Sequence, residues 1–176
     1  MEEKERYEKA LAFAQRKHEG QFRIGGDPYI THPMAVAQIV KDEGYGIDYQ
    51  IAALFHDLLE DTDASEEEIL EIGGADVLEA VTLLTKQKGY VMADYIAGIR
   101  GNKIAFAVKA ADRLHNLKSA GCTDMDFKRK YILETVDWYL DFSLAIKKAV
   151  KALAESLEKP LTELPFLYTP IESWKK

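Results

Sequence analysis

The chain has 176 residues, 47% of them hydrophobic and 30% charged, which is the composition of a single globular domain with a continuous core. Its formal net charge of −7 argues against general binding to nucleic acid or to an anionic membrane, and no apolar run approaches the length of a membrane span. The lone Cys122 and a charged N-terminus without a secretory signal predict a cytoplasmic protein.

Helical periodicity runs through nearly the whole chain. Apolar residues recur at spacings of three and four, and this pattern predicts helices over about residues 3–18, 33–44, 49–61, 65–73, 77–84, 91–100, 103–119 and 125–157. His32 is the expected N-cap of the second helix, because Pro33 suits the first helical position, and Asp48 is the expected cap of the third. His18 is expected to cap the last carbonyls of the first helix, and Ser65 to Glu68 (SEEE) is the pattern of a capping box that opens the fourth. Since no segment alternates as a strand does, the predicted fold class is all-α.

The last stretch, residues 158–176, has Pro160, Pro165 and Pro170 among aromatic residues. Prolines at this density rule out an α-helix, and three aromatic side chains are too many for a free tail. We therefore expect one domain over residues 1–157, followed by an extended Pro/aromatic C-terminal tail over residues 158–176. The tail is expected to pack on that domain or on a partner subunit, and a homodimer is compatible with it.

Ionisable residues stand inside or beside the apolar runs at three places. His32 precedes Pro33, His56 and Asp57 directly follow five apolar residues, and Asp112 lies on the apolar face of its helix. An ionisable group in such surroundings is unfavourable unless something neutralises it. A divalent cation held by two imidazoles and two carboxylates would do so. The sequence thus predicts a metal site of His32, His56, Asp57 and Asp112.

Simpler explanations stay open for part of this pattern. Taken alone, Asp112 is explained equally well by a structural ion pair with Lys109 or Arg113. The acidic run that follows Asp61 is typical of a solvated helix end. That explanation does not cover His56 and Asp57.

The ligand types indicate the chemistry. Imidazoles and carboxylates without thiolates suit Mn²⁺, Fe²⁺ or Zn²⁺, and four protein ligands leave positions for water and a substrate oxygen. A metal in such a site lowers the pKa of water and polarises a phosphoryl group, as in metal-assisted hydrolysis. Glu60 and Asp61 follow within one turn, where they are placed to take or deliver protons.

Four blocks carry a more specific signal: His18–Arg23 (HEGQFR), Gly26–Pro33 (GDPYITHP), His56–Thr62 (HDLLEDT) and Val108–Leu117 (VKAADRLHNL). Together they resemble the hydrolase domain of RelA/SpoT-type alarmone enzymes, within the HD phosphohydrolase superfamily. The match covers roughly residues 4 to 120. It implies a single all-α HD-domain helical bundle. Because the chain is too short to contain a synthetase domain as well, the resemblance implies a stand-alone small alarmone hydrolase.

The resemblance also implies roles for individual residues. The metal ligands, with Mn²⁺ as the usual metal, fall on His32, His56, Asp57 and Asp112. The acidic pair that activates the attacking water falls on Glu60 and Asp61. The implied substrate contacts are Arg23 on the guanine base, Asn116 with Lys109 on ribose or phosphate, and Tyr131. The chain departs from the family pattern at Ile24, where many relatives have a basic residue, and at Phe127, where an arginine is expected.

These observations lead to one hypothesis and two alternatives. The hypothesis is a Mn²⁺-dependent phosphohydrolase of the stringent response, which converts the small nucleotides ppGpp and pppGpp to GDP or GTP and pyrophosphate. One alternative is an HD phosphohydrolase for another nucleotide, such as a nucleoside monophosphate or an NADPH-like nucleotide, and Ile24 favours it. The other is a nucleotide-binding module without turnover, which would not need both Glu60 and Asp61.

Overall fold

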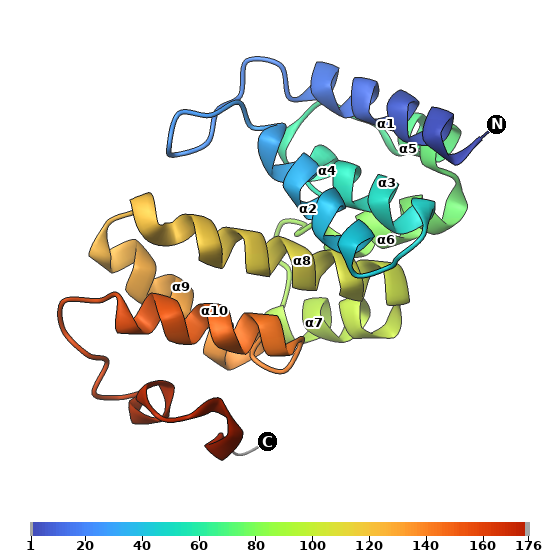
Figure 1. Ribbon diagram of the computed structural model, residues 1–176. Coiled ribbons are helices and arrows are strands. Elements are labelled where there is room, and N and C mark those ends of the chain that lie inside the picture. Colours follow the sequence, from blue (N-terminus) through green and yellow to red (C-terminus); the bar gives the residue numbers. More distant parts are fainter. Residues whose placement is uncertain (1, 175–176) are drawn as a thin grey trace. The chain divides into compact units, whose positions relative to one another are not determined.

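The computed structural model describes residues 2–174, and its regular elements are helices (Figure 1). Its α-helices are α1 (Glu3–Lys17), α2 (Thr31–Asp42), α3 (Ile47–Phe55), α4 (Leu58–Asp61), α5 (Glu66–Gly73), α6 (Ala75–Leu84), α7 (Met92–Gly101), α8 (Lys103–Ser119), α9 (Met125–Trp138) and α10 (Leu144–Glu155). Three short 3-10 helices are η1 (Ala120–Cys122), η2 (Pro165–Tyr168) and η3 (Ile171–Ser173). Within residues 2–174, strand-like pairing is limited to one isolated bridge between Phe22 and Pro28. The predicted all-α class is confirmed.

The described residues form two compact units that divide after Asp112, inside α8. The predicted metal ligands all belong to the first unit, as do Arg23, Glu60, Asp61 and Lys109. Asn116 and Tyr131 belong to the second. The division expected from the sequence, with a tail from residue 158, stays a prediction. None of the helices in residues 2–174 combines the length and apolarity needed to cross a membrane.

Helix α3 lies at the centre of the first unit. Its five consecutive apolar residues, Ile51 to Phe55, are fully buried, and α1, α2 and α6 pack around them. The ring of Phe55 meets that of Phe13 edge to face, with centroids 5.5 Å apart. A helix that is apolar on all sides is stable only in such a position. The core therefore holds the C-terminal end of α3, where His56 follows, in place.

The helix expected over residues 49–61 is in fact two helices. Helix α3 ends at Phe55 and α4 begins at Leu58, so His56 and Asp57 occupy the turn between them. Asp57 has φ −105° and ψ −1°, away from the values of a regular helix. The turn lets both side chains approach one point, which adjacent positions 100° apart on a continuous helix do less well.

Two expected caps are also wrong. His32 is the second residue of α2 and Ile30 is the N-cap, because a proline fits anywhere in the first turn, where its missing N–H has no helical partner. Asp48 lies inside the first turn of α3, after the N-cap Gly46. Its carboxylate accepts a hydrogen bond from Arg6 at 2.7 Å instead. The Asp48 carboxylate thus pairs with a residue 42 positions away instead of capping its own helix, and the local pattern does not reveal such a pairing.

The predicted capping box is confirmed. The Ser65 hydroxyl accepts from the Glu68 N–H at 3.3 Å, and the Glu68 carboxylate accepts from the Ser65 N–H at 3.0 Å. Helix α5 then ends at Gly73, and Gly74 has φ +90°, a conformation that favours glycine.

The long helix expected over residues 125–157 is interrupted in the second unit. Helix α9 ends at Trp138, and α10 starts after Ser143, whose hydroxyl accepts from the Ile146 N–H at 3.1 Å. The intervening turn buries Tyr139 and Phe142, with ring centroids 5.3 Å apart. Burial of two aromatic rings stabilises the break, and Ser143 supplies the cap that makes a new helix start there.

The segment after residue 157 packs on α10. Leu161 and Leu167 are buried, the Tyr168 hydroxyl accepts from the Leu161 N–H at 2.8 Å, and Lys151 of α10 donates to the Leu167 carbonyl at 3.0 Å. From residue 156 to 174 there is no α-helix, as the prolines predict. Two 3-10 turns interrupt the extended path, because Pro165 already has the φ that the first position of η2 requires.

Candidate metal centre

The four predicted metal ligands converge in the first unit. His32 comes from the first turn of α2, His56 and Asp57 from the turn between α3 and α4, and Asp112 from α8. His32, His56 and Asp112 are buried, and the Asp57 side chain is 22% exposed. Three segments that are far apart in the sequence therefore place two imidazoles and two carboxylates together.

The atoms that face one another are the Nε2 nitrogens and one oxygen of each carboxylate. Asp57 Oδ2 is 2.9 Å from His56 Nε2 and 3.9 Å from His32 Nε2. Asp112 Oδ1 is 3.0 Å from His32 Nε2 and 3.6 Å from His56 Nε2. Nitrogen and oxygen ligands of a divalent metal lie about 2.0–2.2 Å from it, hence within about 4.4 Å of one another. The four histidine–carboxylate distances fall within that limit. One ligand atom from each of His32, His56 and Asp57 also lies within 4.8 Å of the other two, whereas Asp112 is close to the two histidines.

The hydrogen bonds of His56 also fit a metal ligand. Its Nδ1 is 2.7 Å from the Ala53 carbonyl oxygen, which can only accept, so Nδ1 carries the hydrogen. In the neutral ring, the lone pair of Nε2 then faces the carboxylates. This buried nitrogen makes no hydrogen bond within residues 2–174, although Asp57 Oδ2 is close. A metal-binding histidine typically has one buried nitrogen free to bind the metal, while a hydrogen bond at its other nitrogen fixes the tautomer.

The electrostatics favour a cation at this point. Burial lowers the pKa of His56, but the carboxylates of Asp57 and Asp112 outweigh burial and raise that pKa well above its usual value. Burial raises the pKa of Asp57, but His56 outweighs it, and the pKa is about 2. For Asp112, Lys109 and the two histidines outweigh burial and hold the pKa well below its usual value. Burial lowers the pKa of His32. The two carboxylates are therefore ionised.

Lys109, expected to hold ribose or phosphate, lies against a predicted ligand. Its Nζ donates to Asp112 Oδ2 at 2.9 Å and lies 5.9 Å from the centre of the Tyr95 ring. The ion pair that the sequence left open for Asp112 thus exists beside the cluster. The two explanations are compatible, because Lys109 uses one carboxylate oxygen and the histidines face the other. The role of Lys109 toward substrate stays a prediction.

Glu60 and Asp61 lie on α4, immediately after the cluster, and both are exposed. Glu60 Oε2 accepts a hydrogen bond from the Lys86 N–H at 3.0 Å. A hollow of about 310 Å³ beside it is lined by Glu60, Thr82, Thr85 and Lys86, among others. Burial, then the charges of Asp57 and Glu60, raise the pKa of Asp61 to about 6. A carboxyl group with a pKa near neutrality can accept and release protons at physiological pH.

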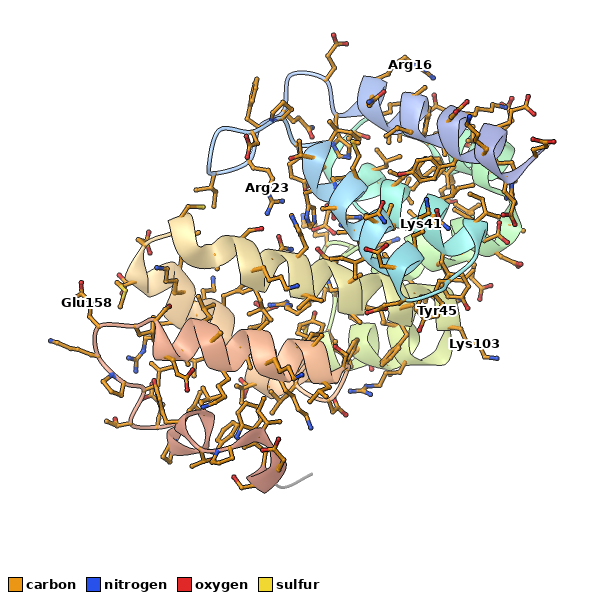
Figure 2. All side chains as sticks on the ribbon, in the orientation of Figure 1. Arg16, Arg23, Lys41, Tyr45, Lys103 and Glu158 are labelled. Carbon is orange, nitrogen blue, oxygen red and sulfur yellow. The ribbon has the colours of Figure 1, made fainter. Side chains whose placement is uncertain are left out.

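Arg23 projects from the loop between α1 and α2 (Figure 2). Its N–H donates to the Asp27 carbonyl at 2.8 Å, and its carbonyl accepts from the Gly26 N–H at 2.9 Å, which closes a tight turn. Ile24, on the same turn, is 76% exposed. The role of Arg23 in holding a base stays a prediction.

The two other predicted substrate contacts lie in the second unit. Asn116 is on α8, and Tyr131 is on α9 with its ring 4.2 Å from the guanidinium carbon of the buried Arg113. Phe127, where an arginine was expected, stacks on Tyr131 with ring centroids 5.7 Å apart. Their contacts with substrate stay predictions.

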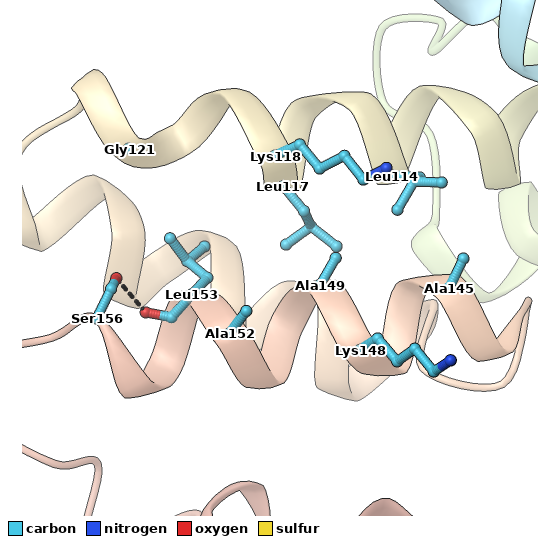
Figure 3. A pocket seen from close by; sticks show the side chains of 10 residues that line it. All are labelled: Leu114, Leu117, Lys118, Gly121, Ala145, Lys148, Ala149, Ala152, Leu153 and Ser156. Carbon is cyan, nitrogen blue, oxygen red and sulfur yellow. Dashed lines mark hydrogen bonds between the residues drawn. The ribbon is translucent and has the colours of Figure 1, made fainter.

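The second unit also contains an apolar hollow of about 500 Å³, between the C-terminal part of α8 and the length of α10 (Figure 3). Leu117, Ala149 and Leu153 line it, with Lys118 and Lys148 at its edge. None of the predicted site residues lines this hollow.

Sequence reasoning did not single out Tyr29 and Gln21, and it gave His18 a different role. The Tyr29 hydroxyl donates to Asp57 Oδ2 at 2.5 Å, and Gln21 Nε2 donates to the Asp61 carbonyl at 2.8 Å. His18 was expected to cap the last carbonyls of α1, but its ring is buried and its Nδ1 lies 2.7 Å from Gln21 Oε1. A signal was present, because these residues belong to the two N-terminal blocks that carry the resemblance.

The chain is similar to known proteins in sequence and in fold. The HD domain family matches residues 10–93. The GTP pyrophosphokinase rsh of Brucella melitensis is 34% identical over 95% of this chain and 23% of its own length. The guanosine-3′,5′-bis(diphosphate) 3′-pyrophosphohydrolase of Haemophilus influenzae is 35% identical over 82% of this chain and 23% of its own length. The chain thus spans less than a quarter of the curated relatives it matches.

A solved structure agrees in fold. A metazoan ortholog of SpoT, described as hydrolysing ppGpp, matches with a TM-score of 0.70 at 24% identity, over 85% of this chain and 94% of that chain. At this identity the likeness concerns the fold alone. With the sequence matches, it extends the relation well beyond the HD segment itself. The chain thus matches the HD domain over residues 10–93 and resembles SpoT- and rsh-type proteins in sequence over most of its length.

Proposed function

We propose that this chain is a metal-dependent phosphohydrolase that removes the 3′-pyrophosphate of ppGpp or pppGpp, releasing GDP or GTP and pyrophosphate. The observation that carries the proposal is the convergence of His32, His56, Asp57 and Asp112 next to the acidic pair Glu60 and Asp61. The names of the Haemophilus relative and of the metazoan structure support the substrate. A site of imidazoles, carboxylates and a neighbouring proton acceptor is suited to hydrolysis of a phosphate ester.

His32, His56, Asp57 and Asp112 would hold the metal, which we propose to be Mn²⁺. Imidazole and carboxylate donors suit Mn²⁺ but also Fe²⁺ and Zn²⁺, so the metal is identified by measurement and not by the ligand set. When bound, the metal supplies a Lewis acid that polarises the phosphoryl oxygen and makes water more acidic.

Asp61 is placed to accept the proton of the attacking water. Water forms a bond to the phosphorus attached to the 3′ oxygen, the bond from phosphorus to that oxygen breaks, and the 3′ oxygen takes up a proton. A pKa of about 6 lets Asp61 be ionised before attack and release its proton afterwards. The Lys86 N–H fixes the neighbouring Glu60 at 3.0 Å, which keeps a second carboxylate directed beside it.

Substrate binding is proposed for Arg23 on the base, and for Asn116, Lys109 and Tyr131 on the rest of the nucleotide. The proposed partner is a small nucleotide and not nucleic acid, which the formal net charge of −7 disfavours. The proposed compartment is the cytoplasm, and the exposed, free Cys122 suits a reducing environment.

A second candidate is hydrolysis of a different nucleotide by the same centre. Ile24 favours it, because an exposed apolar side chain stands beside Arg23, and an apolar side chain offers a phosphate no charge or hydrogen bond. A binding module without turnover is disfavoured, since binding alone gives no reason for a proton acceptor beside the cluster.

The deciding experiment incubates the purified protein with ppGpp and Mn²⁺, with and without EDTA, and identifies the products. Release of GDP and pyrophosphate that EDTA abolishes is the expected result. Glu158→Gln, an exposed substitution in the second unit, serves as the unaffected control. Metal binding without turnover of ppGpp would contradict the substrate and direct the test to nucleoside monophosphates and NADPH, where release of orthophosphate identifies the reaction.

A further inference from the structure

The Tyr29 hydroxyl contacts the candidate metal centre through the carboxylate of Asp57. It donates to Asp57 Oδ2 at 2.5 Å, the same oxygen that lies 2.9 Å from His56 Nε2 and 3.9 Å from His32 Nε2. A carboxylate oxygen has two lone-pair directions. When the tyrosine hydroxyl occupies one of them, the other is left for the space between the histidine nitrogens.

Asp57 needs such a partner more than the other ligands do. It sits in the turn between α3 and α4, its side chain is 22% exposed, and a second carboxylate, Asp112, repels it from the same cluster. Asp112, in comparison, is buried on a long helix and held by Lys109 at 2.9 Å. A hydrogen bond from a fixed donor restricts the rotation of a carboxylate that lies on a turn beside a like charge.

Tyr29 can act as this donor because its own position is fixed. Its ring lies against that of the buried His18, with centroids 4.8 Å apart and planes inclined by 38°. Its N–H donates to the Gln21 carbonyl at 2.9 Å, which closes the base of the loop. The Tyr29 ring also lies near the His32 ring in a T-shaped arrangement, with centroids 6.0 Å apart. The tyrosine thus has little freedom to follow a moving carboxylate.

Gln21 connects His18 and Tyr29 to Asp61 through hydrogen bonds. Its Nε2 donates to the Asp61 carbonyl at 2.8 Å, so its Oε1 accepts from His18 Nδ1 at 2.7 Å. His18, Gln21 and Tyr29, which we call the brace, therefore bond to the carboxylate of Asp57 and to the backbone of Asp61. The loop that the brace closes also carries Arg23.

We infer that Tyr29 is a positioning residue of the metal centre, which aims Asp57 at the metal, and that His18 and Gln21 hold Tyr29 in register with Asp61. The inference rests on the metal site of the proposed function but not on the identity of the nucleotide. Outer partners of metal ligands typically change metal affinity or activity by about 10–100-fold when they are removed.

The test is Tyr29→Phe, which removes the hydroxyl and keeps the ring against His18. Isothermal titration of the full chain with Mn²⁺, without nucleotide, is expected to show about a 10–100-fold weaker Kd than the wild type. With Co²⁺ as a spectroscopic probe, the visible absorption bands should shift, because one ligand is reoriented. At saturating Mn²⁺, kcat should fall while KM stays within about twofold.

Tyr45→Phe is the matched control. Tyr45 is 38% exposed, and its ring stacks on Tyr49 in the first unit. It precedes the start of α3, whereas His56 and Asp57 follow the opposite end of that helix. This variant should bind Mn²⁺ as the wild type does. Gln21→Leu provides a second test of the brace, because it cuts the bonds to His18 and Asp61 without touching Asp57. A smaller loss in kcat, of several-fold, is expected with it.

Two results would overturn the inference. One is a Kd for Mn²⁺ in Tyr29→Phe within twofold of the wild type. The other is a loss of Tm in this variant that is equal in EDTA and in Mn²⁺, which would mean that the hydroxyl serves packing only. A wild type that binds Mn²⁺ but leaves ppGpp intact would contradict the proposed substrate alone, and the comparison with Tyr29→Phe would still stand.

Discussion

Lys109 and Asp112 form an ion pair through one carboxylate oxygen, and the other oxygen of Asp112 faces the histidines. Lys109 Nζ bonds Oδ2 of Asp112 at 2.9 Å, and Oδ1 of the same group lies 3.0 Å from His32 Nε2. Both partners are on α8, three residues apart, so the helix alone sets this pairing. Lys109 stabilises a buried carboxylate and at the same time fixes which oxygen faces the histidines.

Removal of this cation should therefore destabilise the protein in a metal-dependent way. Lys109→Met leaves Asp112 with one donor fewer, a loss of about 1–3 kcal/mol, or roughly 2–10 °C in Tm, measured in EDTA. The loss should be smaller in Mn²⁺, because a bound cation also stabilises Asp112. Lys103→Met, at the exposed start of the same helix, is the control. An equal loss in EDTA and in Mn²⁺ would show that Lys109 acts independently of the metal.

His56→Ala should remove the metal centre without unfolding the chain. Mn²⁺ at 100 times its Kd is expected to stabilise the wild type by about 2.7 kcal/mol, or roughly 5–10 °C in Tm. This shift should disappear in the variant, and turnover should fall by about a thousandfold or more. Thermal melts with and without Mn²⁺, together with far-ultraviolet circular dichroism, check both points. A variant that keeps the metal-dependent shift would exclude His56 as a ligand.

Asp61→Asn should lose activity and gain stability. Its folded pKa of about 6 lies above the ordinary value of 3.8, so the folded state favours the protonated form. That contribution to stability is complete below about pH 4 and is lost as the pH rises through 6. The asparagine amide does not ionise, so the Asp61→Asn variant does not lose stability in this way as the pH rises. In EDTA at pH 7.5 we expect a Tm higher by about 1–3 °C, a small gain because solvent screens this exposed group, and no difference near pH 4.

The activity of Asp61→Asn provides the complementary measurement. Loss of a general base typically lowers kcat by about 10²–10⁴-fold, and Mn²⁺ affinity should stay close to that of the wild type. Unchanged turnover would contradict the proposed role of Asp61 and leave Glu60 as the proton acceptor to test.

Ser143→Ala tests the break between α9 and α10. The hydroxyl caps α10 through the Ile146 N–H, so its removal should lower stability by about 1 kcal/mol, or roughly 2–4 °C in Tm. Ser143→Asp keeps an acceptor at the cap and adds a negative charge at a helix N-terminus, so it should restore the wild-type Tm. If Ser143→Ala and Ser143→Asp have the same Tm, the buried turn alone accounts for the break between α9 and α10.

The sequence by itself determined what depends on neighbours along the chain. The helical periods, the capping box at Ser65 and the absence of strand alternation predict the all-α fold, because each rests on contacts within about four residues. The sequence also pointed to a candidate set of metal ligands, and their role stays a prediction. An ionisable pair such as His56 and Asp57 after five apolar residues is hard to explain without a neutralising partner.

Tertiary structure decided what depends on residues far apart in sequence. The bond from Arg6 that draws Asp48 away from a capping role and the bond from the Tyr29 hydroxyl to Asp57 join separate segments. The helix break at His56 was likewise not visible in the local pattern. A prediction from the local pattern considers each residue only together with its neighbours in the same helix. A long-range hydrogen bond or the burial of a ring can exceed the energy of one cap or one helical turn, so such contacts move boundaries and choose partners that the sequence leaves open.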